Sequence, residues 1–270
     1  MDDRKLLVVI IRTPKSDRYI PIDSLLKDDQ RFNLEYIEAS MTPSYSEVSN
    51  KGISYSSEVF EYFQRRKLTP EEIGCADSHN RARSIIRDNS FGGIILEDDA
   101  RIIDVDLLFQ EVNMFLTIHK NTASILNLTG FRNLSKKKSS RISFTRILTQ
   151  PDLAVGYALN SLASQYLLNA NYPITDVADW PRSKCKYYVS SFRKIVHGDF
   201  NTKSLIDSNE LGFRSSPRKN LKFKNFLFIL FLKKSKKIRF RNYFSTVIIS
   251  SILWRTENIR LIILGFRVTK

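Results

Sequence analysis

Short apolar runs divided by polar turns predict that strands and helices alternate along most of the chain. Residues 6–11 form an uninterrupted apolar run that stops at Arg12, a pattern typical of a strand buried on both faces. Residues 32–37 alternate between apolar and polar positions and predict a second strand. Residues 13–18 predict a loop that leads into a helix, and residues 42–57, rich in Ser, Tyr and Pro, predict a loop or lid.

The clearest helix begins at Thr69. Thr69 can cap the first turn, Pro70 suits the first helical position, and Glu72 completes a capping box. Apolar residues then recur at helical spacing until Asn and Gly break the pattern at residues 89–93. The all-apolar residues 94–96 follow, and they predict a strand buried on both faces.

Two further strands are predicted at residues 125–128 and 153–159, followed by a helix at residues 161–169. Strand, helix and strand in alternation predict an α/β fold with a mostly parallel, doubly wound central sheet. The sequence contains no internal repeat.

The composition is that of an ordinary folded protein, with 42% hydrophobic and 26% charged residues in a chain of 270. The two cysteines, Cys75 and Cys185, are too few for a disulfide framework. We therefore expect a reducing compartment, and we interpret both cysteines as small buried residues and not as ligands. No apolar run approaches the roughly 18 residues needed to cross a bilayer, so we expect a cytoplasmic protein without a transmembrane anchor.

The net charge of +15 is concentrated toward the C-terminal end. Residues 214–270 hold 15 Lys and Arg against one acid, Glu257, whereas residues 1–213 are close to neutral. We therefore divide the chain into a body at residues 1–213 and a basic, amphipathic helical appendage at residues 214–270.

The appendage combines apolar runs at residues 226–232, 247–252 and 261–266 with flanking Lys and Arg. Such segments suit the interface of an anionic membrane, where each basic side chain contributes about 1 kcal/mol. Two alternatives remain, a helical subdomain that packs on the body and a nucleic-acid-binding surface. The sequence contains no recognisable nucleic-acid module, and its aromatics lie inside apolar runs, so we expect no nucleic-acid partner.

Three consecutive acids follow the strand predicted at residues 94–96. Ligands of open α/β sheets bind beyond the carboxyl ends of the strands, so Glu97, Asp98 and Asp99 stand where a ligand is expected. Because successive strand residues point to opposite faces, Glu97 and Asp99 can share a direction while Asp98 turns aside. Two such carboxylates suit a hard divalent cation that keeps open positions for substrate phosphates. The alternative is a solvated turn.

Five further residues are candidates for function. His79, on the apolar face of its helix, is either a satisfied core residue or a substrate contact, and Ser78 can bond back to its own helix. Asp176 and Asp179 lie in a loop-like segment, where either is a candidate general base or a simple turn and cap residue. His197 can complete a metal site from a neighbouring loop.

Taken in order, these segments resemble the family 25 glycosyltransferases, the lipopolysaccharide and lipooligosaccharide biosynthesis enzymes that include bacterial β-galactosyltransferases. The matching segments are residues 68–75, LTPEEIGC, with Ser78 and His79 behind them, and residues 95–99, ILEDD. The resemblance covers roughly residues 6–206.

The resemblance implies a GT-A-type fold and inverting transfer of a hexose from a UDP-sugar to a glycolipid acceptor, with UDP-galactose the donor that the family favours. By this likeness, Glu97 and Asp99 match the motif that holds Mn²⁺ or Mg²⁺ on the donor diphosphate. Arg12, Ser78 and His79 match positions that line the donor pocket. The basic appendage would then hold the enzyme peripherally on the inner membrane, near a glycolipid acceptor.

The chain departs from the family pattern at two places. Asp77 stands where the family usually has an apolar residue, and Ser40-Met41 stands where an Asp-Gly pair is common. These departures motivate a second hypothesis, a non-catalytic, membrane-bound scaffold of glycolipid assembly. Metal-dependent binding of a UDP-sugar separates the two hypotheses.

Overall fold

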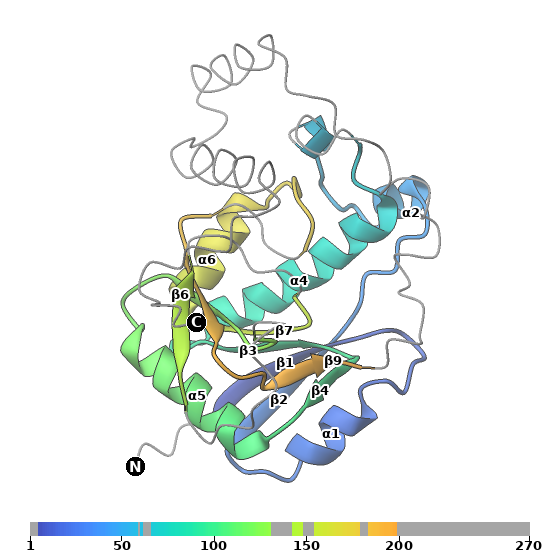
Figure 1. Cartoon of the computed structure of the whole chain (residues 1–270). Helices are drawn as coiled ribbons and strands as arrows, with labels where there is room; N and C mark the ends of the chain where they lie inside the picture. The colour runs from blue at the N-terminus through green and yellow to red at the C-terminus, as the bar shows by residue number, and fades with distance from the viewer. Residues whose placement is uncertain are drawn as a thin grey trace, which may run out of the picture.

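The protein folds as an α/β sandwich in which helices cover both faces of a central sheet (Figure 1). The structure, a computed structural model, describes residues 5–58, 60–61, 66–130, 142–147, 154–178 and 183–198. The helices and strands of these residues are β1 (Leu6–Arg12), α1 (Ile20–Leu26), β2 (Phe32–Glu38), α2 (Tyr45–Asn50), α4 (Pro70–Asp88), β3 (Gly93–Glu97), β4 (Ala100–Ile102), α5 (Val105–Ile118), β5 (Ser124–Asn127), β6 (Phe144–Ile147), β7 (Gly156–Leu159), α6 (Ser161–Ala170), β8 (Lys186–Ser190) and β9 (Ile195–His197).

The seven strands of the main sheet lie in the order β2-β1-β3-β7-β5-β8-β6. β1 pairs in parallel with both β2 and β3, and β5 pairs in parallel with β8. β7 runs antiparallel to β3 and β5, and β6 runs antiparallel to β8. All strands except β7 and β6 therefore point the same way, which confirms the predicted mostly parallel sheet. β4 and β9 form a separate two-stranded ladder.

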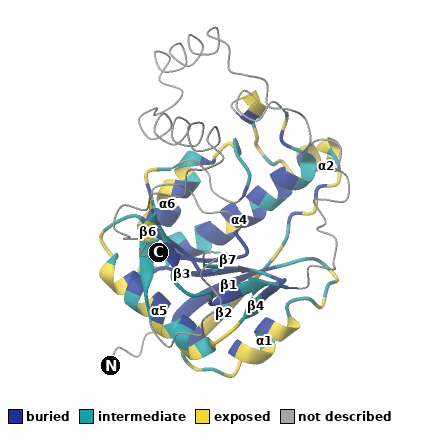
Figure 2. Cartoon of the chain, viewed as in Figure 1, coloured by how far each residue is buried: buried dark blue, intermediate teal, exposed yellow. Residues whose placement is uncertain are grey.

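β1 is buried on both faces, as the uninterrupted apolar run at residues 6–11 predicts. Leu6, Val8 and Ile10 of β1 join the core that packs under α1 and α5. Leu7 and Val9 point to the opposite face and join the core under α4 and α6. Figure 2 shows the central strands β1, β3 and β7 buried between helices whose outer faces are exposed.

Helix α4 begins where the sequence predicts. The Thr69 hydroxyl accepts from the Glu72 N–H at 3.2 Å, and the Glu72 carboxylate accepts from the Thr69 N–H at 3.0 Å, so the capping box is complete. Because α4 ends shortly before β3 begins, the two elements run in opposite directions. The first turns of α4 therefore lie near the carboxyl edge of the sheet, where β3 ends.

A small third core forms at this edge from the segment predicted as a loop or lid. Val48, Leu68 and Ile73 pack there with Ile174 and Ala178, which follow α6. The lid is more structured than predicted, because α2 lies within residues 42–57. A six-residue helix is too short to show apolar periodicity; here a Ser44 cap and one buried residue, Val48, stabilise it.

Within the part of the chain that the structure describes, no helix combines the length and the apolarity needed to cross a membrane. The basic appendage at residues 214–270 and its boundary with the body lie outside the described residues, so both stay predictions.

Candidate functional site

The three consecutive acids lie in the turn after β3, at the carboxyl edge of the sheet. β1 and β3 run side by side there, with Ile11 opposite Glu97. Asp98 and Asp99 are only 5% and 7% exposed, so the alternative of a solvated turn is wrong for them. Carboxylates buried in this way need partners, and the surrounding elements supply them.

Asp98 holds the loop that follows β1. Its Oδ2 accepts from the Thr13 N–H at 2.9 Å, and its Oδ1 lies 3.6 Å from Arg18 Nε. Because the protein itself engages this carboxylate, Asp98 positions the loop at residues 13–18. Glu97 and Asp99 are left as the candidate ligands, in line with the predicted alternation.

Asp99 lies between a guanidinium and an imidazole. Arg18 Nη2 donates to Asp99 Oδ2 at 2.5 Å, and His197 Nε2 lies 3.1 Å from the same oxygen. The β4–β9 ladder brings His197 opposite Ala100, and the Gly198 N–H donates to the Asp99 carbonyl at 2.6 Å. The second carboxylate oxygen, Asp99 Oδ1, is buried and has no hydrogen-bond partner among the described residues.

The electrostatics of Asp99 favour an added positive charge. Burial and the neighbouring Glu97 carboxylate raise the pKa of Asp99, and the nearby His197 and Arg18 only partly offset this. A cation bound to Asp99 Oδ1 would satisfy a buried oxygen and relieve the repulsion between the two carboxylates. The structure thus brings Asp99 and His197 into contact, with Glu97 near enough for its charge to act on Asp99 and for the charge of His197 to act on Glu97.

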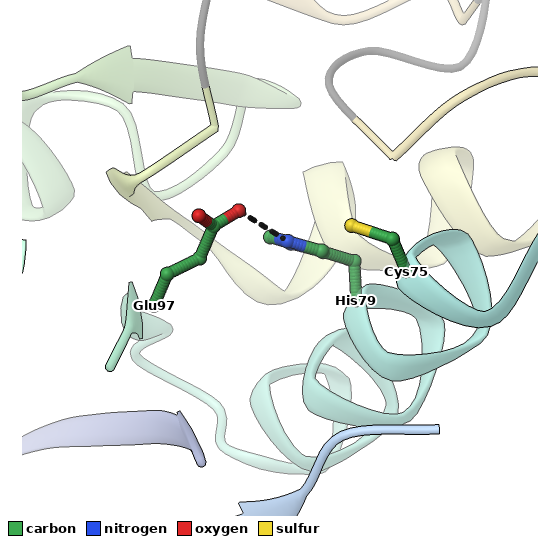
Figure 3. A group of neighbouring side chains, drawn as sticks. All are labelled: Cys75, His79 and Glu97. Atoms are coloured by element: carbon green, nitrogen blue, oxygen red, sulfur yellow. Dashed lines mark hydrogen bonds and ion pairs between the residues drawn. The ribbon is translucent and has the colours of Figure 1, made fainter. Parts of the chain in front are cut away.

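Two side chains of α4, Cys75 and the buried His79, lie beside Glu97 (Figure 3). His79 is 1% exposed, with Nε2 3.1 Å from Glu97 Oε1 and Nδ1 3.0 Å from the Tyr157 hydroxyl. The Tyr157 ring stacks on the imidazole, with centroids 5.8 Å apart. His79 is therefore a satisfied core residue that also contacts the acidic cluster, and Cys75 lies one helical turn before it.

Glu97 is held ionised by these contacts. Burial alone would raise its pKa, but the hydrogen bond and charge of His79, with smaller contributions from His197 and Arg18, lower the pKa of Glu97 overall. The side chain keeps 28% of its surface exposed. Glu97 is thus an ionised carboxylate with a fixed orientation and access to solvent.

Arg12 ends β1 beside a cavity of about 260 Å³ that the β1 loop and Glu38 line. Its guanidinium carbon lies 5.1 Å from the ring centroids of both Tyr19 and Tyr36. The Arg12 Nε is buried and has no hydrogen-bond partner among the described residues. Arg12, which is predicted to line the pocket of the sugar donor, therefore borders an open space at the carboxyl edge of the sheet.

Ser78 is buried behind this edge. Its hydroxyl donates to the Gly74 carbonyl and accepts from the Ser40 N–H, each at 2.8 Å. It thus bonds back to its own helix and also fixes the chain after β2. The two departures from the family pattern meet here, because the Ser40 hydroxyl donates to the Asp77 carboxylate at 2.5 Å.

Asp176 lies in the segment that follows α6. The Asn171 side chain accepts from the Asp176 N–H at 3.3 Å, and Arg83 of α4 donates to the Ala178 carbonyl at 2.8 Å, so this segment packs against α4. The Asp176 carboxylate accepts from the Val177 N–H at 3.1 Å. Asp179 lies outside the described residues, and its role as a base stays a prediction.

Two residues to which the sequence analysis gave no role take part in the site. Arg18 contacts both Asp98 and Asp99, and its place in the loop after the first strand is a signal that could have found it. Tyr157 contacts His79 because β7 pairs antiparallel with β3, placing Tyr157 opposite Ile95. No local sequence pattern predicts the pairing of β7 with β3.

A family of known proteins matches the chain over the part that holds the acids of the site. A family model described as "Glycosyltransferase family 25 (LPS biosynthesis protein)" matches residues 22–181, more than half of the chain. These residues include α4, the acids after β3 and the segment after α6. A comparison with curated proteins found no match.

Proposed function

The chain belongs to glycosyltransferase family 25, the family of lipopolysaccharide biosynthesis proteins, and we propose that it transfers a hexose from a UDP-sugar to a glycolipid acceptor. UDP-galactose is the proposed donor, and the transfer inverts the anomeric carbon. The observation that carries the proposal is the pair of carboxylates at the carboxyl edge of the sheet. One of them, Asp99, has a buried oxygen without a hydrogen-bond partner among the described residues.

The residues at this edge fit a divalent cation. Glu97 and Asp99 would hold Mn²⁺ or Mg²⁺ through their oxygens, and His197 would add a nitrogen ligand, a set that suits Mn²⁺ well. When bound, the ion supplies Lewis-acid stabilisation of the negative charge on the departing diphosphate. Arg18 lies beside Asp99 and would contribute further positive charge to the same phosphates.

The cavity beside Arg12 is the proposed place for part of the nucleotide. It adjoins the loop at residues 13–18, which Asp98 fixes, and it lies at the carboxyl ends of β1 and β2. Arg12 Nε, which has no hydrogen-bond partner in the described part of the chain, lies next to this space. His79 and Ser78 act indirectly, through other residues. His79 orients Glu97, and Ser78 fixes the chain after β2.

We assign the general base to Asp176 or Asp179. The base takes the proton of the acceptor hydroxyl while that oxygen forms a bond to the anomeric carbon. The bond from the anomeric carbon to the diphosphate oxygen breaks on the opposite face, and the leaving group departs as UDP. The sugar passes through an oxocarbenium-like state, in which positive charge develops at the anomeric carbon. We place this carbon near Glu97 and Asp99, whose negative charge would stabilise that state.

The basic appendage at residues 214–270 is proposed to hold the enzyme peripherally on the cytoplasmic face of the inner membrane. Its 15 basic residues and its three apolar runs suit an anionic surface. In a vesicle flotation assay, the full-length protein should rise with anionic vesicles and stay at the bottom of the gradient when the vesicles are zwitterionic. Equal binding to both would remove the electrostatic part of this proposal.

Calorimetric titration of UDP-galactose, with UDP-glucose beside it, tests the donor site with and without Mn²⁺. We expect metal-dependent binding in the wild type and its loss in Asp99→Ala. Asp88→Ala removes an exposed acid at the far end of α4 and serves as the matched control. Absence of binding to either sugar nucleotide would favour the scaffold hypothesis.

The base assignment has its own test. Asp176→Asn and Asp179→Asn should each keep donor binding, and the one that removes the base should lose transfer to the acceptor. Wild-type turnover in both variants would refute the assignment of the base to this segment.

A further inference from the structure

Cys75, His79 and Glu97 form a group whose ligand atoms all lie within 4.8 Å of one another. Figure 3 shows the Cys75 thiol and the His79 ring on the same side of α4, with Glu97 reaching toward them from the end of β3. From the sequence, we expect Cys75 to be a small buried residue. The structure instead leaves it partly exposed beside an imidazole and a carboxylate.

The distance between His79 Nε2 and Glu97 Oε1 suits two ligands of one metal ion. His79 Nε2 and Glu97 Oε1 are 3.1 Å apart, so a proton or a cation must lie between them. Tetrahedral zinc with ordinary bond lengths would hold such atoms about 3.3 Å apart. The Cys75 sulfur would then need to move by on the order of 1 Å at most.

The His79 ring is also supported as metal ligands usually are. A ligating histidine normally bonds a polar partner through its second nitrogen, which fixes the ring. Here Nδ1 lies 3.0 Å from the Tyr157 hydroxyl, and Tyr157 is fully buried. With a metal on Nε2, the Nδ1–H would donate to that hydroxyl without any change of position.

We propose that Cys75, His79 and Glu97 form a zinc-binding site. A thiolate and an imidazole favour zinc over magnesium or calcium, which prefer oxygen ligands. The three protein ligands leave a fourth position open. The partial exposure of Cys75 and Glu97 gives an ion access to the site.

The site shares Glu97 with the cation proposed for the donor diphosphate. Zinc at Cys75 would take Glu97 Oε1, the oxygen beside His79 Nε2, and leave only the second oxygen of Glu97 for the donor-site ion, whose binding it would weaken. Zinc is therefore an inhibitor of the transferase, and this consequence, unlike the site itself, rests on the proposed function.

Cobalt(II), the spectroscopic substitute for zinc, gives a direct test with the reduced, untagged, full-length protein and no substrate. A thiolate ligand produces a charge-transfer band in the near ultraviolet that excess zinc abolishes. The chain has two cysteines, so the band can be assigned by substitution. Cys185→Ser is the matched control, because Cys185 is buried and its thiol donates to the Ala163 carbonyl.

We expect the band in wild type and in Cys185→Ser, and its loss in Cys75→Ser. Tyr157→Phe should keep the ligands and weaken cobalt binding about 10- to 100-fold, since it removes the support of His79. Thermal melting of each variant checks that it folds. Absence of the band in the folded wild type, or its persistence in Cys75→Ser, would overturn the site.

Zinc inhibition of transfer, measured relative to each protein's own zinc-free rate, tests the shared carboxylate. Wild type and Cys185→Ser should be inhibited, and Cys75→Ser should need at least about tenfold more zinc. Equal inhibition of Cys75→Ser would overturn the claim that zinc inhibits transfer by engaging Glu97 from Cys75. The cobalt band would then remain the test of the zinc site itself. Loss of all transfer in every protein would instead count against the proposed function.

Discussion

Replacing Tyr157 by Phe removes one oxygen atom from the row of polar side chains behind Glu97. The hydroxyl lies 3.0 Å from His79 Nδ1, and the ring, fully buried, stacks on the imidazole at 5.8 Å. Phe keeps the ring and its packing, so the change removes only the contacts of the hydroxyl, those with His79 and Arg83 among them. A buried ring nitrogen left without its partner costs about 1–3 kcal/mol.

The melting temperature should fall by roughly 2–4 °C for each kcal/mol lost in a protein of this size. Donor binding should weaken and UDP release should slow, because a loosened His79 no longer fixes the Glu97 carboxylate. Differential scanning calorimetry and a UDP-release assay measure the two effects. Tyr166→Phe, on the exposed face of α6, is the control. Unchanged stability and unchanged turnover in Tyr157→Phe would refute the reasoning.

Three further predictions follow from the described contacts. Burial and Glu97 raise the pKa of Asp99 in the folded, metal-free protein, so its ionisation opposes folding above that pKa. Asp99→Asn should therefore raise the melting temperature at neutral pH. This gain should vanish at acidic pH, below the pKa of Asp99 in the unfolded chain, and melting curves over a pH series measure it. The same substitution should abolish metal-dependent donor binding. Lys194 and Glu111 form a buried ion pair at 3.3 Å, and Lys194→Met alone should cost about 3–5 kcal/mol of stability in denaturant titration, most of it recovered on adding Glu111→Leu. In Gly198→Ala, the new Cβ would lie 2.6 Å from the Asp99 carbonyl oxygen, so β9 must shift and Mn²⁺ affinity should fall, as paramagnetic titration can measure.

The elements that the sequence predicts well are those whose signals are local. The capping box at Thr69 and the all-apolar run at residues 6–11 each encode their structure within a few residues, and both appear as predicted. Glu97 and Asp99 were placed at the carboxyl edge by the same reasoning, since strand ends and sheet edges are readable from the pattern. The pairing of β7 with β3 and of β8 with β5 depends on contacts between distant segments, which no short pattern encodes.

The site shows the same division. Of the two interpretations of His79, the structure shows the satisfied core residue, and a substrate contact stays a prediction. Its partner Tyr157 comes from a strand 78 residues further along the chain. Cys75 was interpreted as a small buried residue because a single cysteine in a helix carries no spatial information. Only the fold brings its thiol beside His79 and Glu97. The position of His197 opposite Ala100 likewise required the β4–β9 ladder.

Formation of a galactosylated glycolipid, with release of UDP, tests the central claim most directly. Purified full-length protein is mixed with UDP-galactose, Mn²⁺ and a truncated lipooligosaccharide acceptor, beside Asp99→Ala and the Asp88→Ala control. The account predicts metal-dependent product with wild type and Asp88→Ala and none with Asp99→Ala. Equal product from Asp99→Ala would contradict it, because the carboxylates after β3 would then have no part in the transfer.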